Sequence, residues 1–284
     1  MVAALAIVTD SIACLPPDVA ADLDVCVVPI RIIHRGQVLR DELEVTLDEV
    51  FEWQQRGQPV STSQPSAGDF VEAYRRLAAH AEAIVSIHVS AAMTGVYQSA
   101  RLAASLVPEV PIRVIDSQAA TIAEGFLVLE AARMARVGAT LDEIERFVLA
   151  LRPRIRFFAV LDTVKHLVHS GRAPLLASLA VDVLQIKPIL TLVDGRIVML
   201  ARARTRRRAL REMVERMARD VGHRPVRVAV FHAAAQEEAE RLRSEVVDRF
   251  ECRECLLVTV TPAMGLYTGP GLLGLAYYTD PADR

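Results

Sequence analysis

Short apolar runs alternate with helical apolar patterns over the first half of this chain, and this alternation constrains the fold most. Runs at residues 5–8, 84–89 and 112–115 are each followed by a segment whose apolar residues recur at helical spacing. Strands that alternate with helices predict a mostly parallel sheet with helices on both faces. We therefore expect residues 1–152 to form an α/β domain.

Residues 153–284 have a different pattern. Asp194-Gly195 stands between apolar runs at 189–193 and 197–200, as in a two-residue hairpin turn, which requires antiparallel pairing. This half is expected to be an α+β domain on a mixed sheet. Its other expected strands lie at 155–161, 226–231, 256–260 and 273–278, and its longer helices at 205–220 and 236–249.

The stretch 84–100 reads as strand, loop and helix, with Ser90, Thr94 and Gly95 in the loop. A helix start presents unpaired backbone N–H groups and the positive end of the helix dipole. Hydroxyls beside it would suit a carboxylate or a phosphate. The alternative is that Thr94 only caps the helix and Gly95 only turns the chain.

A second hydroxyl cluster precedes Pro65. Ser66 and Asp69 form a capping-box pattern for the next helix, so Ser66 alone satisfies the cap. Thr62 and Ser63 are left as candidate ligand-binding groups or as solvated loop hydroxyls.

Two expected strands end in the same dipeptide, Asp10-Ser11 and Asp116-Ser117. Because ligands bind at the carboxyl ends of strands in open α/β sheets, both pairs point to one crevice. A small-molecule hydrolase or phosphotransferase could use them. The chain has neither a G-x-S-x-G elbow nor a G-x-x-x-x-G-K-[ST] loop, so an enzyme is the second hypothesis.

Two segments of the second half also stand out. Arginines at 202, 204 and 206–208 surround an expected helix N-terminus, where cations oppose the helix dipole, so an acidic partner is predicted. Residues 267–271 place a proline between two glycines, which predicts a rigid turn.

Composition and charge exclude several functional classes. The formal net charge of −2 gives no basic field for nucleic acid, and no apolar run reaches the roughly 18 residues of a membrane span. The N-terminus has no basic leader, so a cytoplasmic location is expected. Cys252 and Cys255 lack a second ligand pair, and His166 and His169 lack a third ligand, so no metal or cofactor is predicted.

Taken together, these motifs resemble the DegV family over nearly the whole chain. The segments that carry the resemblance are Ile7–Ser11, Thr62–Ser66, Thr94–Ala100, Asp116-Ser117, Ser170–Arg172, Lys187–Leu190, Asp194-Gly195 and Gly269–Gly271.

This resemblance implies a two-domain α/β protein that binds a long-chain fatty acid in a buried tunnel. It further implies the binding subunit of a bacterial fatty acid kinase, which serves phospholipid synthesis and has no catalytic residue of its own. A separate ATP-binding subunit would phosphorylate the bound carboxylate.

The family's site residues carry over by position. The resemblance assigns carboxylate binding to Thr62, Ser63, Thr94 and Gly95. An additional site would use Arg172 and Tyr267, where Tyr267 occupies the place of the family's usual histidine. Docking of the kinase subunit is assigned to Arg202, Arg204 and Arg206.

Overall fold

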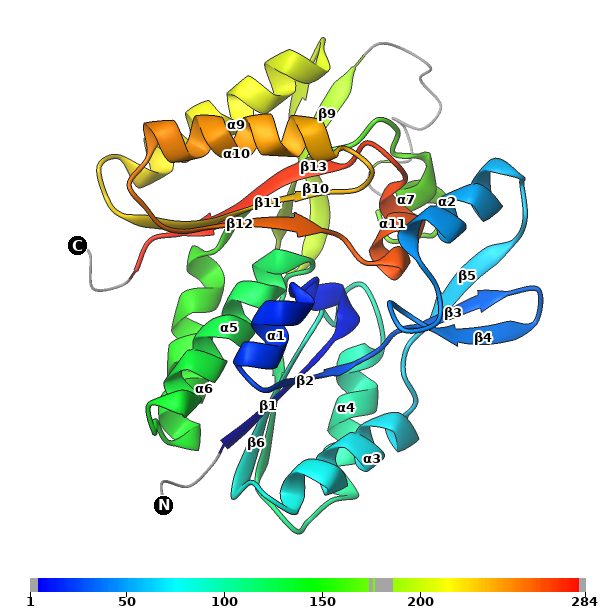
Figure 1. Ribbon diagram of the computed structural model, residues 1–284, viewed down its shortest axis with the longest axis vertical. Coiled ribbons are helices and arrows are strands. Elements are labelled where there is room, and N and C mark those ends of the chain that lie inside the picture. The colour runs from blue at the N-terminus through cyan, green and yellow to red at the C-terminus, as the bar shows by residue number, and fades with distance from the viewer. Residues whose placement is uncertain (1–4, 174–175, 177–185, 281–284) are drawn as a thin grey trace. The chain divides into compact units, whose positions relative to one another are not determined.

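The computed structural model describes residues 5–173, 176 and 186–280, which form two compact units (Figure 1). The first unit ends at Pro153 and also contains Thr261–Ala263. The second contains Arg154–Val260 and resumes at Met264. The expected domains, 1–152 and 153–284, placed residues 261–263 in the second domain, whereas in the structure they belong to the first unit. Each unit is described below by itself.

The first unit is built on a four-stranded sheet of order β2-β1-β6-β7, in which every pairing is parallel. All six residues of β6 are buried, as expected of a central strand with helices on both faces. The predicted α/β architecture is confirmed. The elements are β1 (Leu5–Asp10), β2 (Val25–Val28), β6 (Ala83–His88), β7 (Ile112–Asp116), α1 (Pro17–Asp22), α3 (Ala67–Ala78), α4 (Val96–Ser105), α5 (Ile122–Arg136), α6 (Leu141–Leu151) and the 3₁₀ turns Ser11–Ala13 and Arg152–Arg154.

The first unit also contains a three-stranded antiparallel sheet of order β4-β3-β5. Its strands are β3 (Arg31–His34), β4 (Gln37–Arg40) and β5 (Val60–Ser63), and α2 (Leu47–Gln55) lies between β4 and β5 in the chain. Residues 31–40 form an antiparallel hairpin with Arg35-Gly36 at its turn, and its first strand does not extend back to residue 25. Pro29 lacks the N–H that a continuous strand would need, so residues 25–28 join the parallel sheet instead.

The second unit has a six-stranded mixed sheet of order β10-β9-β8-β13-β11-β12, in which only β11 and β12 pair in parallel. Figure 1 shows α9 and α10 side by side along this sheet, and their apolar faces share a core with it. The elements are β8 (Arg156–Val160), β9 (Lys187–Val193), β10 (Arg196–Ala203), β11 (Val226–His232), β12 (Cys252–Thr259), β13 (Leu273–Tyr278), α7 (Lys165–His169), α9 (Arg206–Val221), α10 (Gln236–Arg249) and α11 (Pro262–Thr268), whose first two residues belong to the first unit.

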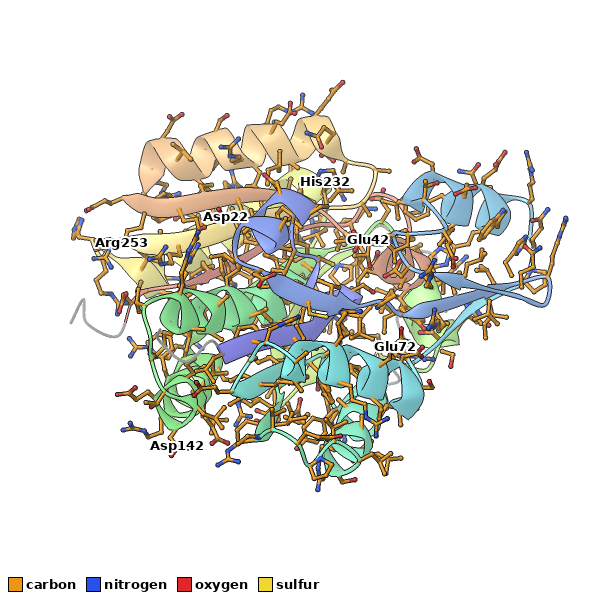
Figure 2. All side chains as sticks on the ribbon, turned by 60° about the horizontal axis from the view of Figure 1, so that its bottom comes forward. Asp22, Glu42, Glu72, Asp142, His232 and Arg253 are labelled. Carbon is orange, nitrogen blue, oxygen red and sulfur yellow. The ribbon has the colours of Figure 1, made fainter. Side chains whose placement is uncertain are left out.

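Two further observations concern helices. The predicted turn at 267–271 begins later than expected, because Tyr267 and Thr268 are the last residues of α11. Charged residues such as Glu72 of α3 and Asp142 of α6 lie on exposed helix surfaces (Figure 2). Within the ranges that the structure describes, no helix is both long and apolar enough to cross a membrane.

Candidate ligand site

Thr62 lies in β5, where it pairs with the buried Ile32 of β3. It is half-buried, whereas the next residue, Ser63, is exposed and donates a hydrogen bond to the carbonyl of Gln64 at 3.2 Å. Consecutive side chains of a strand point to opposite faces. Thr62 and Ser63 therefore do not face one ligand, and Ser63 leaves the predicted site.

The segment after Thr62 is held at its far end by the start of α3. Pro65 is buried, and Ser66 and Asp69 form the predicted capping box through both the backbone and the side chains. Asp69 also makes an ion pair with Arg31 of β3. The loop between β5 and α3 is thus fixed at both ends.

Thr94 is not the cap of α4. The N-cap residue is Gly95, which makes no side-chain capping bond, and the helix begins at Val96. This finding overturns the alternative in which Thr94 only caps the helix. Thr94 is half-buried immediately before a helix start whose N-cap contributes no side chain to the first-turn N–H groups.

Gln64 brings the two predicted stretches together. A Cβ atom placed on Gly95 would lie 2.7 Å from the Nε2 atom of Gln64 and 2.8 Å from its Oε1 atom. The side-chain amide of Gln64 therefore rests on the backbone of Gly95. As a result, the segment that carries Thr62 contacts the segment that carries Thr94 within the first unit.

Arg172 and Tyr267 meet in the second unit. The guanidinium carbon of Arg172 lies 4.9 Å from the centre of the Tyr267 ring, within cation–π range, and its Nη1 atom donates to the carbonyl of Ser170 at 2.6 Å. His166 packs against Gly269, where an added Cβ would lie 2.8 Å from the ring, and burial lowers the pKa of His166.

Arg206 does not belong to an open docking surface. Its side chain is only 18% exposed; it donates to Glu238 at 2.8 Å and to the carbonyl of Gly271 at 2.7 Å. It also pairs with Asp162 at 3.4 Å. The acidic groups that meet Arg206 therefore belong to its own unit and not to a partner protein.

Arg202 and Arg204 remain exposed near the end of β10. They line a shallow groove between β10 and α9, which also contains Arg208, Arg211, Glu212 and Glu215. This groove, which we call the β10–α9 groove, is the basic surface that the arginine cluster offers.

The Asp-Ser pairs at the strand ends serve the fold. Asp10 accepts hydrogen bonds from the N–H groups of Ile12 and Val89, each at 3.1 Å. Ser11 donates to Asp41 at 2.6 Å and accepts from the N–H of Ile30 at 3.1 Å.

The second pair behaves in the same way. Asp116 accepts from the N–H groups of Ala91 and Gln118, and Ser117 accepts from the N–H of Ala119. The groups that a hydrolase or phosphotransferase would have used are therefore occupied by backbone and neighbouring side chains.

A buried polar chain that the sequence analysis did not identify crosses the first unit. The Nδ1 atom of His88 lies 3.0 Å from Asp10, its Nε2 atom lies 2.7 Å from Ser86, and Ser86 lies 2.8 Å from the hydroxyl of Tyr74. All four residues are 0% exposed, so this Asp-His-Ser arrangement lies in the interior of the protein. The alternation of Ser86 and His88 in an apolar run was the available sequence indication, because it places both on one face of β6.

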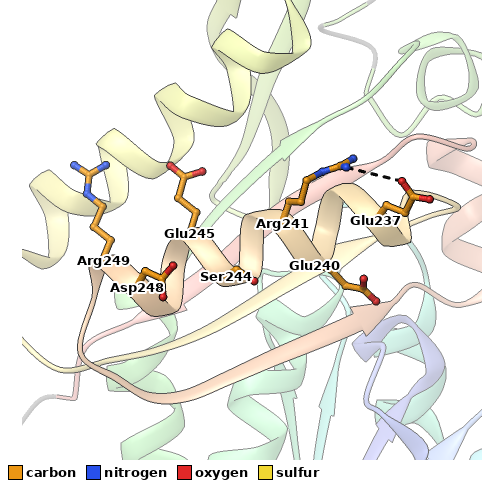
Figure 3. A pocket seen from close by; sticks show the side chains of 7 residues that line it. All are labelled: Glu237, Glu240, Arg241, Ser244, Glu245, Asp248 and Arg249. Carbon is orange, nitrogen blue, oxygen red and sulfur yellow. Dashed lines mark ion pairs between the residues drawn. The ribbon is translucent and has the colours of Figure 1, made fainter.

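The outer face of α10 is a polar depression that does not suit an anion. Figure 3 shows Glu237, Glu240, Glu245 and Asp248 along it, accompanied by Arg241 and Arg249. Four carboxylates there would repel the headgroup of a fatty acid. In the part of the chain that the structure describes, no three His, Cys, Asp or Glu side chains gather as metal ligands.

Comparison with known proteins identifies relatives of the whole chain. The sequence model of the DegV family, described as a family of uncharacterised proteins, matches residues 4–280. A DegV domain-containing protein of Streptomyces coelicolor is 35% identical over 273 residues, which cover 95% of this chain and 97% of the relative.

Solved structures agree with this match. The fold is similar, with a TM-score of 0.92 and 30% identity, to a DegV family protein from Thermus thermophilus described for its fatty acid binding. It is also similar, with a TM-score of 0.90 and 27% identity, to DegV of Bacillus subtilis, described as a fatty acid binding protein. Each comparison covers 98% of this chain and 100% of the other. The chain belongs to the DegV family.

Proposed function

We propose that this protein binds one long-chain fatty acid and that its first unit holds the carboxylate with the hydroxyls of Thr62 and Thr94. Backbone N–H groups at the start of α4, beside Gly95, complete the donor set. The observation that carries the proposal is the contact of Gln64 with Gly95, which joins the segments of the two threonines. The fatty acid binding of the structurally similar DegV proteins supports the same ligand class.

The energetics suit this ligand. Hydrogen bonds to a charged group contribute roughly 1.5–3 kcal/mol each, so two hydroxyls and helix-start amides form a sufficient donor set. Each buried methylene adds about 0.8 kcal/mol, so the acyl chain provides most of the affinity. A helix N-terminus also favours negative charge near its first turn.

In the proposed function the protein has no catalytic residue and presents the carboxylate to a separate ATP-dependent fatty acid kinase subunit. Arg202 and Arg204 of the β10–α9 groove would contact an acidic surface of that subunit. Their exposure supports this assignment, whereas the internal bonds of Arg206 remove it from the docking set. Arg172 and Tyr267, which contact each other, are proposed as the additional site.

The experiment compares a fatty acid with its methyl ester. Displacement of a fluorescent fatty acid by oleate and by methyl oleate would be measured on the delipidated protein. The ester keeps the acyl chain and loses the charge, so the proposal predicts at least about tenfold weaker binding of the ester. Equal affinity of the two compounds would overturn carboxylate recognition, and no displacement by either would overturn fatty acid binding.

A further inference from the structure

We infer that Gln64 is a positioning residue, whose side-chain amide sets the separation of the Thr62 and Thr94 hydroxyls by resting on Gly95. The inference depends on the proposed function, since it concerns the carboxylate that the two threonines would share. It adds Gln64 to the two threonines of the proposed site. The role follows from the position of Gln64 between the two segments.

The backbone conformation of Gly95 does not explain why this residue is glycine. Its φ of −85° and ψ of 8° are open to any L-residue. The space above its Cα atom does explain it, because the amide of Gln64 occupies the place of a Cβ. Gly95 therefore allows the close approach of the Gln64 amide, and a larger residue at position 95 would have to displace the end of this exposed side chain.

The contact is broad. The Nε2, Oε1 and Cδ atoms of Gln64 would lie 2.7, 2.8 and 2.9 Å from a Cβ on Gly95. Because these three distances are nearly equal, the amide plane faces the Cα atom of Gly95. The contact places the side-chain amide of Gln64 against the N-cap residue of α4.

The location of Gln64 in the chain links the position of Gly95 to that of Thr62. It is two residues from Thr62 in β5 and directly precedes the buried Pro65, which restricts its backbone to extended conformations. The capping box of Ser66 and Asp69 and the ion pair between Asp69 and Arg31 hold the other side of the loop. A displacement of Gly95 would therefore change the distance between Thr94 and an anchored Thr62.

The test uses Gly95→Ala, Gln64→Ala and the double variant, with Gly68→Ala as the matched control. A Cβ at Gly68 would meet only the Oγ atom of Ser66, at an ordinary 3.4 Å, so the control should keep wild-type affinity. Gly95→Ala forces the amide of Gln64 away and should weaken oleate binding at least about tenfold. Gln64→Ala removes the contact and should weaken binding about threefold to tenfold.

The double variant gives the decisive comparison. Gln64→Ala removes the three atoms nearest to a Cβ at position 95, so the double variant should bind oleate as Gln64→Ala does. Additive losses would overturn the inference. Wild-type affinity of Gln64→Ala would also overturn it.

A second measurement separates positioning from general support of the fold. If Gln64 positions the threonines, Gln64→Ala should lower the affinity for oleate and leave the affinity for methyl oleate unchanged. The ratio of the oleate affinity to the methyl oleate affinity should therefore be smaller than in the wild type. Equal loss for both compounds would show that Gln64 only supports the fold. Failure of the wild-type protein to bind oleate would instead refute the proposed function, and this outcome differs from all those above.

Discussion

Asp41 accepts a hydrogen bond from the backbone N–H of Ala263 at 2.9 Å, although 222 positions separate the two residues in the sequence. Its other carboxylate oxygen accepts from Ser11 at 2.6 Å, and Asp41 is 1% exposed. This buried carboxyl therefore holds the short segment Thr261–Ala263 in the first unit, which explains why that segment belongs there.

The Asp41 contact predicts a pH dependence of stability. Burial raises the pKa of Asp41 to about 6 in the folded protein, above its usual value in the unfolded chain. A raised pKa gives a stabilisation that is complete below the unfolded pKa and is lost as the pH rises through 6. Relative to Asp41→Asn, the wild-type protein should gain about 1–2 kcal/mol of unfolding free energy between pH 8 and pH 5.

Urea unfolding of both proteins at several pH values between 5 and 8 measures this difference. The comparison cancels the titration of groups that do not interact with Asp41. Glu42 does interact with it, because burial and, after it, the charge of Asp41 raise the pKa of Glu42 to about 7. If the two stability profiles run parallel across this range, the carboxyl of Asp41 does not titrate there and the prediction is wrong.

The two threonines should act on binding and not on folding. Thr62→Val and Thr94→Val should each weaken oleate binding about tenfold to a hundredfold, because each loses one hydrogen bond to a charged group. Ser61→Ala and Ser63→Ala change exposed hydroxyls of the same strand and should bind as the wild type does. The double variant Thr62→Val/Thr94→Val should lose less than the sum, because both hydroxyls would serve one carboxylate. Strict additivity in the displacement assay would place the headgroup elsewhere.

The arginines should divide into two groups. Charge reversal of Arg202 and Arg204 together should abolish phosphate transfer by a cognate kinase subunit and leave oleate affinity within about threefold of the wild type. Arg206→Ala should instead lower the thermal midpoint of the protein, because it removes the guanidinium that donates to Glu238, to Asp162 and to the carbonyl of Gly271. Transfer assays and thermal melts of the same preparations test this division, and loss of stability in the Arg202/Arg204 variant would contradict it.

Two buried acidic residues of the first unit should respond differently to substitution by the corresponding amide residue. Burial raises the pKa of Glu124 well above its usual value and thereby favours the uncharged carboxyl, so Glu124→Gln should cost less than about 1 kcal/mol. Asp10 accepts hydrogen bonds from two backbone N–H groups and from His88. In Asp10→Asn the side-chain NH2 group, which is itself a donor, would point toward one or more of these donors. Asp10→Asn should cost at least about 2 kcal/mol in urea unfolding. Equal losses of unfolding free energy in Glu124→Gln and Asp10→Asn would contradict this prediction.

Local patterns predicted local structure well. The capping box of Ser66 with Asp69 formed as predicted, because its bonds form within one helical turn. The same motif is present in Thr46 with Glu49 and in Thr140 with Glu143. The Asp194-Gly195 hairpin also formed as predicted, since a two-residue turn specifies its own pairing.

Features that depend on distant partners were not predictable in this way. Thr62 lies in an antiparallel strand and not in a loop of the parallel sheet, because its pairing partner is Ile32, which no local pattern indicates. The internal hydrogen bonds of Arg206 were not predicted because its acidic partners, Asp162 and Glu238, are distant in sequence. The contact of Gln64 with Gly95 likewise requires the packing of α3 against α4.

The most direct test of the central claim is the ligand that the protein carries. Organic extraction of protein purified from a bacterial host, followed by quantitative mass spectrometry, should recover about one long-chain fatty acid per chain. The Thr62→Val/Thr94→Val variant, purified in parallel, should carry much less. Recovery of a nucleotide or a phosphorylated metabolite in place of a fatty acid would contradict the account.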